Sequence, residues 1–337
     1  MKLTPRFRVR RAFAFAAIAP AFFALAAHAG DVAQRSMTSL TPQAVIALGK
    51  TADWVAITPD AVWVGSTGPN AVHRIDPRTN ARVATIALDG EPCAGLATGF
   101  GSLWVPLCGA TPTLAKIDLA SNRLVASFKV AGVQAEGGVT TSDDGVWLVV
   151  DKNGSLLRID PATGDVRQTV RVPAGSYNPK FDHGIVWVTR VDGAEITAVD
   201  AKTGTIRATV RTGPHPRFLT AGAGSIWTLN QGDGSLTRID ASPTRATKTI
   251  ALETPGHGGD IAFGGGAIWT TMMKTPLTMI DAETMTLRCQ WIGTGGDSLG
   301  LGFGAIWLTD YHGGTISRFD LNETKRACER PPSTPSR

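Results

Sequence analysis

This sequence of 337 residues has little net charge, and long apolar runs and helical periodicity are scarce in it. Of its 33 basic residues, five lie within the first 29 positions, where no acidic residue occurs. The rest of the chain therefore carries 28 basic and 28 acidic side chains and is formally neutral. Binding to nucleic acid or to an anionic membrane needs a retained basic face, so neither partner is predicted.

The apolar run from Ala12 to Ala26 is too short for a membrane span, which needs about 20 residues. It follows a basic segment that includes Arg10 and Arg11, and it precedes Ala27-His28-Ala29, a small-x-small cleavage site. We therefore predict a cleaved signal peptide over residues 1–29 and a periplasmic or secreted protein. The paired arginines fit a twin-arginine signal as well as a general secretory one, so the export route stays open.

Cysteine is also scarce, and the four residues present suit an oxidising compartment. Cys93 and Cys108 flank a predicted hairpin that turns midway between them, so they lie opposite each other and we predict a disulfide. The alternative is a pair of free thiols at a strand end. For Cys289 and Cys328, parity supports a bond but no comparable geometry does.

Tryptophan, in contrast, is plentiful and periodic. Seven of the nine tryptophans share one context, a small or turn-forming pair followed by an aliphatic residue and Trp. Their successive spacings are 41, 43, 40, 40, 42 and 38 residues. A repeat of about 40 residues is typical of a four-strand propeller blade. The seven are Trp63, Trp104, Trp147, Trp187, Trp227, Trp269 and Trp307.

Each repeat contains four predicted strands. The first is small and aliphatic, the second carries the Trp, the third ends in Asp, and the fourth closes the unit. The repeated Asp is expected to cap the next turn, and each Trp to pack between neighbouring blades. We therefore predict an all-β fold over residues 44–330, a seven-bladed β-propeller of four-stranded antiparallel blades. Almost no helix is expected, because no apolar period of about 3.6 residues is sustained.

Eight segments qualify as outer strands, although seven blades need only seven. We predict that residues 44–48 pair into the last blade and close the ring, which removes an open sheet edge. Residues 325–329 then add a strand to that blade or lie over it. Residues 30–43 are expected to form a flexible leader and residues 331–337 a disordered tail.

Two stretches resemble known propeller repeats. The run Leu157-Arg158-Ile159-Asp160-Pro161-Ala162-Thr163-Gly164-Asp165-Val166 resembles the YVTN type of bacterial β-propeller repeat. The strand around Trp104 resembles the second strand of a blade in the virginiamycin B lyase, or streptogramin lyase, superfamily. The resemblance covers nearly all of residues 44–329 and implies the propeller fold.

Lyase members of that superfamily open a depsipeptide ring by elimination with a magnesium ion. The resemblance implies a motif of Glu-x-His before a blade's Trp and Glu three residues after it. Here Pro255 and Met272 stand where this motif would have its glutamates, on either side of His257 and Trp269. The turns also resemble those of quinoprotein propellers, but the docking Trp that follows such turns is absent, so no cofactor of that kind is predicted.

In a propeller, the loops that enter each blade and the turns between its second and third strands share one face, called the entry face below. Residues of unusual chemistry there are candidates for a ligand site at the mouth of the central channel. A divalent metal near the histidines is one hypothesis, and a set of solvated loop residues is the alternative. The candidates are Trp54, Glu136, Tyr177, Arg190, His215, Arg217, His257, Asp260, Asp297, Asp310, Tyr311 and His312.

Two functions are consistent with these observations. The first is an exported propeller that binds an unknown small molecule, peptide or protein at the channel mouth without catalysis. Neutral charge and the absence of an intact catalytic motif favour it. The second is a metal-assisted lyase or lactonase that uses the His- and Asp-bearing face of blades five to seven. Metal analysis, with ester and lactone turnover before and after chelation, distinguishes them.

Overall fold

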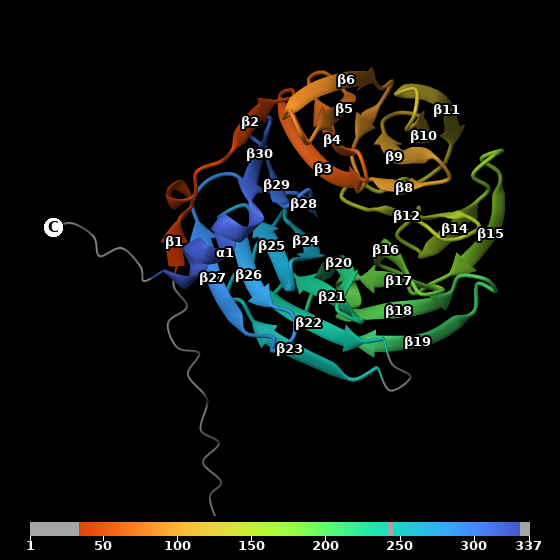
Figure 1. Ribbon diagram of the computed structural model, residues 1–337. Coiled ribbons are helices and arrows are strands. Elements are labelled where there is room, and N and C mark those ends of the chain that lie inside the picture. The colour runs from red at the N-terminus through yellow and green to blue at the C-terminus, as the bar shows by residue number, and fades with distance from the viewer. Residues whose placement is uncertain (1–33, 242–244, 331–337) are drawn as a thin grey trace, which may run out of the picture. The chain divides into compact units, whose positions relative to one another are not determined.

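The computed structural model describes residues 34–241 and 245–330. Within the compact unit formed by Val32–Arg337, seven sheets surround a central channel, as Figure 1 shows. The innermost strand of each sheet contacts the innermost strands of the two neighbouring sheets. The predicted seven-bladed β-propeller is therefore confirmed.

The first four blades follow one another along the chain. Blade 1 contains β3 (Thr51–Thr58), β4 (Ala61–Thr67), β5 (Ala71–Asp76) and β6 (Ala81–Ala87). Blade 2 has an inner strand in two pieces, β7 (Glu91–Pro92) and β8 (Ala97–Gly99), followed by β9 (Ser102–Cys108), β10 (Thr113–Asp118) and β11 (Arg123–Lys129). Blade 3 contains β12 (Val139–Thr141), β13 (Val146–Val149), β14 (Ser155–Ile159) and β15 (Val166–Arg171). Blade 4 contains β16 (Ser176–Asp182), β17 (Ile185–Arg190), the 3-10 turn η2 (Val191–Gly193), β18 (Glu195–Asp200) and β19 (Ile206–Arg211).

The last three blades continue in the same order. Blade 5 contains β20 (Pro216–Gly222), β21 (Ser225–Asn230), β22 (Ser235–Asp240) and β23 (Thr247–Ala251). Blade 6 contains β24 (Asp260–Gly264), β25 (Ala267–Met272), β26 (Thr275–Asp281) and β27 (Leu287–Ile292). Blade 7 draws three strands from this part of the chain, β28 (Leu299–Gly302), β29 (Ala305–Asp310) and β30 (Thr315–Asp320).

The repeated tryptophans lie between the blades, as predicted. Six of the seven have no exposed surface. Trp227 of blade 5 packs in one cluster with Ile261 of blade 6, and the same arrangement recurs at every other junction. Where the ring closes, Trp307 of blade 7 packs with Val62 of blade 1. Burial of such large rings makes the blade junctions the main hydrophobic core.

The indole groups also form hydrogen bonds and cation–π contacts. The Nε1 of Trp227 donates a hydrogen bond to the carbonyl of Gly222 at 2.9 Å. Directly across the strand pair, the guanidinium of Arg238 lies over the same ring at 5.5 Å. An Arg or Lys holds this position in five blades. In blade 7 it is Arg318, which also donates to the carbonyl of Pro77 in blade 1 at 2.6 Å. These contacts reinforce the ring closure.

The repeated Asp at the end of the third strand caps the turn that follows, as predicted. Asp160 Oδ1 accepts hydrogen bonds from the backbone N–H groups of Ala162 and Thr163 at 2.7 and 3.1 Å. Equivalent bonds form in six blades. The role of this Asp is therefore structural.

The N-terminal segment closes the ring. β2 (Ala44–Ala47) pairs antiparallel with β30 and completes blade 7, with Ile46 opposite Ile316. The prediction that this segment joins the last blade is therefore confirmed. β1 (Gln34–Ser36), from the segment expected to form a flexible leader, runs parallel to β27 as a fifth strand of blade 6. The short 3-10 helix η1 (Met37–Ser39) follows it.

Residues 325–329 do not add a strand to the last blade. They belong to the helix α1 (Leu321–Glu329), which contacts β29 and β30 and so lies over blade 7, the other predicted alternative. Asp320 caps the helix by accepting a hydrogen bond from the N–H of Glu323 at 2.8 Å. A helix of nine residues is too short to show a sustained apolar period, which is why the sequence pattern did not reveal it. No helix in the described part of the chain is both long and apolar enough to cross a membrane.

Both cysteine pairs are bonded. The Cys93–Cys108 disulfide, with Cα atoms 5.7 Å apart, confirms the predicted bond. It lies at the break between β7 and β8, where the register with β9 changes. The Cys289–Cys328 disulfide joins β27 to α1, with Cα atoms 5.8 Å apart. The predicted signal peptide (1–29) and the predicted disordered tail (331–337) lie outside the described residues.

Candidate functional site

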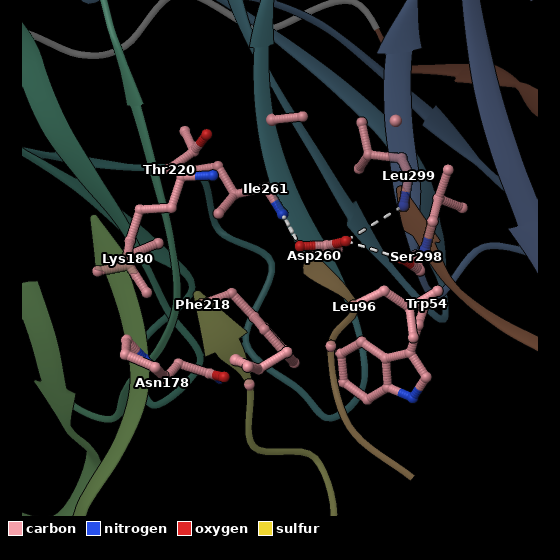
Figure 2. Close-up of a pocket in the computed structure, with 18 residues that line it drawn as sticks. Trp54, Leu96, Asn178, Lys180, Phe218, Thr220, Asp260, Ile261, Ser298 and Leu299 are labelled. Carbon is pink, nitrogen blue, oxygen red and sulfur yellow. Dashed lines mark hydrogen bonds between the residues drawn. The ribbon is translucent and has the colours of Figure 1, made fainter. Parts of the chain in front are cut away.

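Residues of the inner strands, or of the segments next to them, from all seven blades line a cavity of about 220 Å³ at the centre of the ring. Figure 2 shows the mixed character of its wall, where the aromatic rings of Trp54 and Phe218 lie close to charged groups. The two ring centroids are 6.2 Å apart. Lys180 of β16 and Asp260 of β24 are the two charged residues in the lining. The cavity therefore combines an apolar side with one group of each charge.

Four carboxyl groups gather where the channel opens on the entry face. They are Asp53 of β3, Glu136 of the loop before β12, Asp260, and Asp297 of the loop before β28, and they form the carboxyl cluster. Asp53 and Asp297 are only 8% and 5% exposed. Because the four come from four different blades, the cluster exists only in the closed ring.

Backbone and side-chain donors hold the cluster in place. Asp297 Oδ1 accepts a hydrogen bond from the N–H of Gly259 at 2.8 Å, which ties blade 7 to blade 6. Asp260 Oδ2 accepts from the hydroxyl of Ser298 at 2.8 Å. That hydroxyl oxygen in turn accepts from the N–H of Val55 in blade 1 at 3.1 Å. Asp260 therefore belongs to a polar chain that spans the ring closure.

Burial is the first cause of the raised pKa of every member of the cluster. Repulsion by neighbouring carboxylates raises the pKa of Asp53, Glu136 and Asp260 further. The pKa of Glu136 rises to about 7, with Asp297 as the second cause. The pKa of Asp260 rises to about 6. The pKa of Asp53 lies well above its usual value for the same reasons. Near neutral pH the cluster therefore retains protons and gains negative charge as the pH rises.

Arg217 supplies positive charge beside the cluster and lowers the pKa of Glu136. Its guanidinium lies over the ring of Tyr177 at 4.7 Å, and its Nε donates to Gln231 Oε1 at 2.9 Å. The side-chain amide of Asn178 donates to the carbonyl of Arg217 at 2.9 Å and to that of Glu136 at 3.3 Å. These contacts fix the entry loops of blades 3, 4 and 5 around the channel.

Tyr311 and His312 approach the cluster from the turn between β29 and β30. Tyr311 lines a smaller cavity of about 60 Å³ together with Asp53, Trp54 and Glu136. Its ring meets that of His312 edge-on, with centroids 5.2 Å apart. The positive charge of His312 lowers the pKa of Asp297. This turn therefore forms one wall of the channel mouth.

Eight of the twelve residues predicted for a ligand site meet around the mouth, and four lie away from it. Arg190 pairs with Glu195 at 2.7 Å. Asp310 Oδ1 caps its own turn by accepting from the N–H of Gly313 at 2.9 Å. His215 and His257 are exposed in separate entry loops. Within residues 34–241 and 245–330, no three His, Cys, Asp or Glu side chains form a group that could hold a metal. The eight that meet are Trp54, Glu136, Tyr177, Arg217, Asp260, Asp297, Tyr311 and His312.

Sequence reasoning missed Asp53, Asn178 and Lys180. Lys180 carried a signal, since it interrupts the small and aliphatic pattern of an inner strand as Trp54 does. In Figure 2 it extends from β16 into the cavity. Burial lowers the pKa of Lys180, although the charges of Asp260 and Asp182 oppose that effect. The side chain of Lys180 is thus half-buried in the wall of the cavity.

The fold and the mouth define a class, the closed β-propellers with a polar site at the channel entrance. A family model described as "Outer membrane protein assembly factor BamB" matches residues 70–284, and the chain belongs to this family. No curated protein matches the sequence. The resemblance to YVTN repeats and to virginiamycin B lyases stays a prediction, because the matching model is a different one.

Solved structures share the fold. BamB from Moraxella catarrhalis superimposes with a TM-score of 0.61 and 13% identity, covering 83% of this chain and 97% of that one. Hydrazine synthase from Kuenenia stuttgartiensis superimposes with a TM-score of 0.67 and 12% identity, covering 80% of this chain and 96% of that one. At such low identities the likeness concerns the propeller alone.

Proposed function

We propose that this chain is an exported propeller that binds a protein or peptide partner on its entry face, and that it does so without catalysis. The carboxyl cluster receives a cationic side chain of the partner. Trp54 and Tyr311 form the walls against which the stem of that side chain packs.

The convergence of four carboxyl groups carries the proposal. Because burial and mutual repulsion raise their pKa values, ionising the cluster costs free energy, and an ammonium or guanidinium group would recover part of that cost. Arg217 offsets the charge incompletely, since its guanidinium also stacks on Tyr177 and bonds to Gln231. A partner that presents Lys or Arg is therefore favoured over one that presents Asp or Glu.

The family supports a protein partner in the cell envelope, because its model is described as an outer membrane protein assembly factor. Two disulfides, Cys93–Cys108 and Cys289–Cys328, suit an oxidising compartment. The predicted signal peptide agrees with export to the periplasm or beyond, by either route.

Fluorescence anisotropy tests the proposal with labelled Gly/Ser peptides that differ at one central position, Arg in one and Glu in the other. The Arg peptide is expected to bind at pH 8 and the Glu peptide to bind at least tenfold more weakly. At pH 5 the affinity for the Arg peptide should fall at least tenfold, because Glu136 and Asp260, with pKa values of about 7 and 6, become protonated. Equal affinities for the two peptides would count against the proposal.

Matched variants locate the binding site. Asp297→Asn removes one charge from the cluster, while its amide oxygen can still accept the hydrogen bond from Gly259. Asp192→Asn removes an exposed charge from η2, elsewhere on the entry face. The Arg peptide should lose at least fivefold in affinity with the first variant and keep its affinity with the second. Equal losses would show non-specific attraction to the whole face.

The alternative function, a lyase or lactonase, has one observation in its favour. Glu136 has a pKa of about 7, which suits a group that accepts a proton in catalysis near neutral pH. Turnover of esters and lactones, measured with added divalent metal and again after chelation, tests it. Turnover that disappears in Glu136→Gln and after chelation would establish this function instead.

A further inference from the structure

We propose that the cavity below the mouth binds a small zwitterion of the α-amino acid type with an apolar side chain, held between Lys180 and Asp260. This site is distinct from the carboxyl cluster's contact with a partner, although Asp260 borders both. The ligand would enter through the channel mouth.

Lys180 is the first observation. It projects from β16 into the cavity, and the acidic groups that act on it are Asp260 and Asp182. No carboxylate oxygen of the described residues lies within 4.0 Å of its Nζ. The ammonium of this half-buried lysine has no ionic partner among these residues, and its partial desolvation disfavours the charged form. A ligand carboxylate would supply the missing partner.

Asp260 is the second observation. Its Oδ1 accepts one hydrogen bond, from the N–H of Ile261 at 2.7 Å, and its Oδ2 accepts from the Ser298 hydroxyl. A carboxylate offers about four acceptor positions, so Oδ1 can accept another donor from the cavity. Lys180 and Asp260 attract each other across a gap wider than an ion pair. A ligand with both an ammonium and a carboxylate group could bridge that gap.

The rest of the cavity wall determines the size and polarity of the ligand that fits. Leu96, Phe218 and Trp54 supply an apolar surface next to the two charges, as Figure 2 shows. The cavity has a volume of about 220 Å³. Sites for drug-sized ligands are larger, about 300–1,000 Å³. A single amino acid fits this room, whereas a folded peptide segment does not.

The charges around the cavity favour a zwitterion over a simple ion. An anion would have to pass the carboxyl cluster, and a cation would meet Lys180 inside the cavity. A peptide end carries one charge near its terminus, so it could satisfy Lys180 or Asp260 but not both. A free amino acid satisfies each with an opposite charge.

Isothermal titration calorimetry with the full chain tests the proposal by separating the two charges. Leucine is compared with 4-methylpentanoate, which lacks the ammonium, and with 3-methylbutylamine, which lacks the carboxylate. Leucine is expected to bind, and each analogue at least tenfold more weakly. Tight binding of the carboxylate alone would make this an anion site, tight binding of the amine alone a cation site, and no binding of leucine would end the proposal.

Variants connect the affinity to the two residues. Lys180→Met should weaken leucine binding at least tenfold, whereas Lys152→Met, at an exposed lysine on the entry face, should not change it. Asp260→Asn should weaken it similarly. Ser298→Ala removes the hydrogen bond between Ser298 and Asp260 but keeps the Asp260 carboxylate. It therefore distinguishes the effect of a lost charge from the effect of a disturbed contact between the blades. Equal affinities in wild type and Lys180→Met would overturn the assignment.

The outcome is independent of the proposed partner. The Arg peptide reports on the carboxyl cluster, and leucine reports on the cavity. If the Arg peptide binds and leucine does not, the cavity proposal is wrong. If leucine binds and the Arg peptide does not, the proposal for the carboxyl cluster is wrong.

Discussion

Replacing Glu136 by Gln is expected to stabilise the protein at alkaline pH. The substitution keeps the shape of a side chain that forms no hydrogen bond with another described residue, so it removes a charge and little else. Glu136 also has a left-handed backbone, with φ of 63°, and Gln does not change that strain. The variant therefore isolates the cost of ionising one member of the carboxyl cluster.

The magnitude follows from the pKa of Glu136, which burial and Asp297 raise from 4.5 to about 7. Each pKa unit corresponds to about 1.4 kcal/mol, so ionised Glu136 costs at most about 3 kcal/mol above pH 7. Its partial exposure to solvent reduces that cost to about 1–2 kcal/mol. The folded state binds the proton more tightly, so this contribution to stability is present below pH 4.5 and is lost as the pH rises through 7.

Urea unfolding followed by tryptophan fluorescence at pH 4.5 and pH 8 tests this reasoning. Glu136→Gln should exceed the wild type by about 1–2 kcal/mol at pH 8 and match it at pH 4.5. Glu253→Gln is the control, since Glu253 has a similar backbone, with φ of 57°, but lies exposed in another entry loop. It should have the same small effect at both pH values. A Glu136→Gln variant that is less stable than wild type at pH 8 would refute the electrostatic account.

Three further predictions concern the ring. Cys93→Ser should lower the free energy of unfolding by about 3 kcal/mol under oxidising conditions, because the disulfide spans 15 residues. It should have no effect in reductant, and urea unfolding with and without dithiothreitol measures both values. Trp227→Ala should cost about 3–5 kcal/mol in the same assay, and a loss below about 1 kcal/mol would contradict its role as a wedge between blades. Ile46→Asp, on the packed side of the closing strand, should lower the thermal midpoint strongly, whereas Val45→Asp, on its 59% exposed side, should not.

The fold was predictable because one physical requirement is repeated seven times along the chain. Each blade must bury an indole against the next, so the period of Trp104 and its equivalents reveals both the number and the order of the blades. The closing strand, residues 44–47, was predictable for the same reason, since it repeats the pattern of the other outer strands. Helix α1 was not, because its nine residues depend on the cap at Asp320 and on docking to blade 7.

The site was less predictable, because it is assembled across the ring. Topology assigns Glu136 and Asp297 to the entry face, but not the direction in which either side chain points. The same rule grouped His257 with them, although it lies exposed in its own loop. Asp53 was missed because nothing nearby in the sequence distinguishes it from the surface aspartates. Its burial, and its repulsion by Asp297 and Glu136, arise only when the ring closes.

Photo-crosslinking shows directly whether partners bind at the carboxyl-lined mouth. A benzophenone side chain replaces Tyr311, which lines the mouth, or Phe100, which is 42% exposed at a turn on the opposite face. With the Arg peptide at pH 8, we expect a crosslink from position 311 that is lost in Asp297→Asn, and none from position 100. Crosslinks of equal yield from both positions, or from position 100 alone, would contradict it.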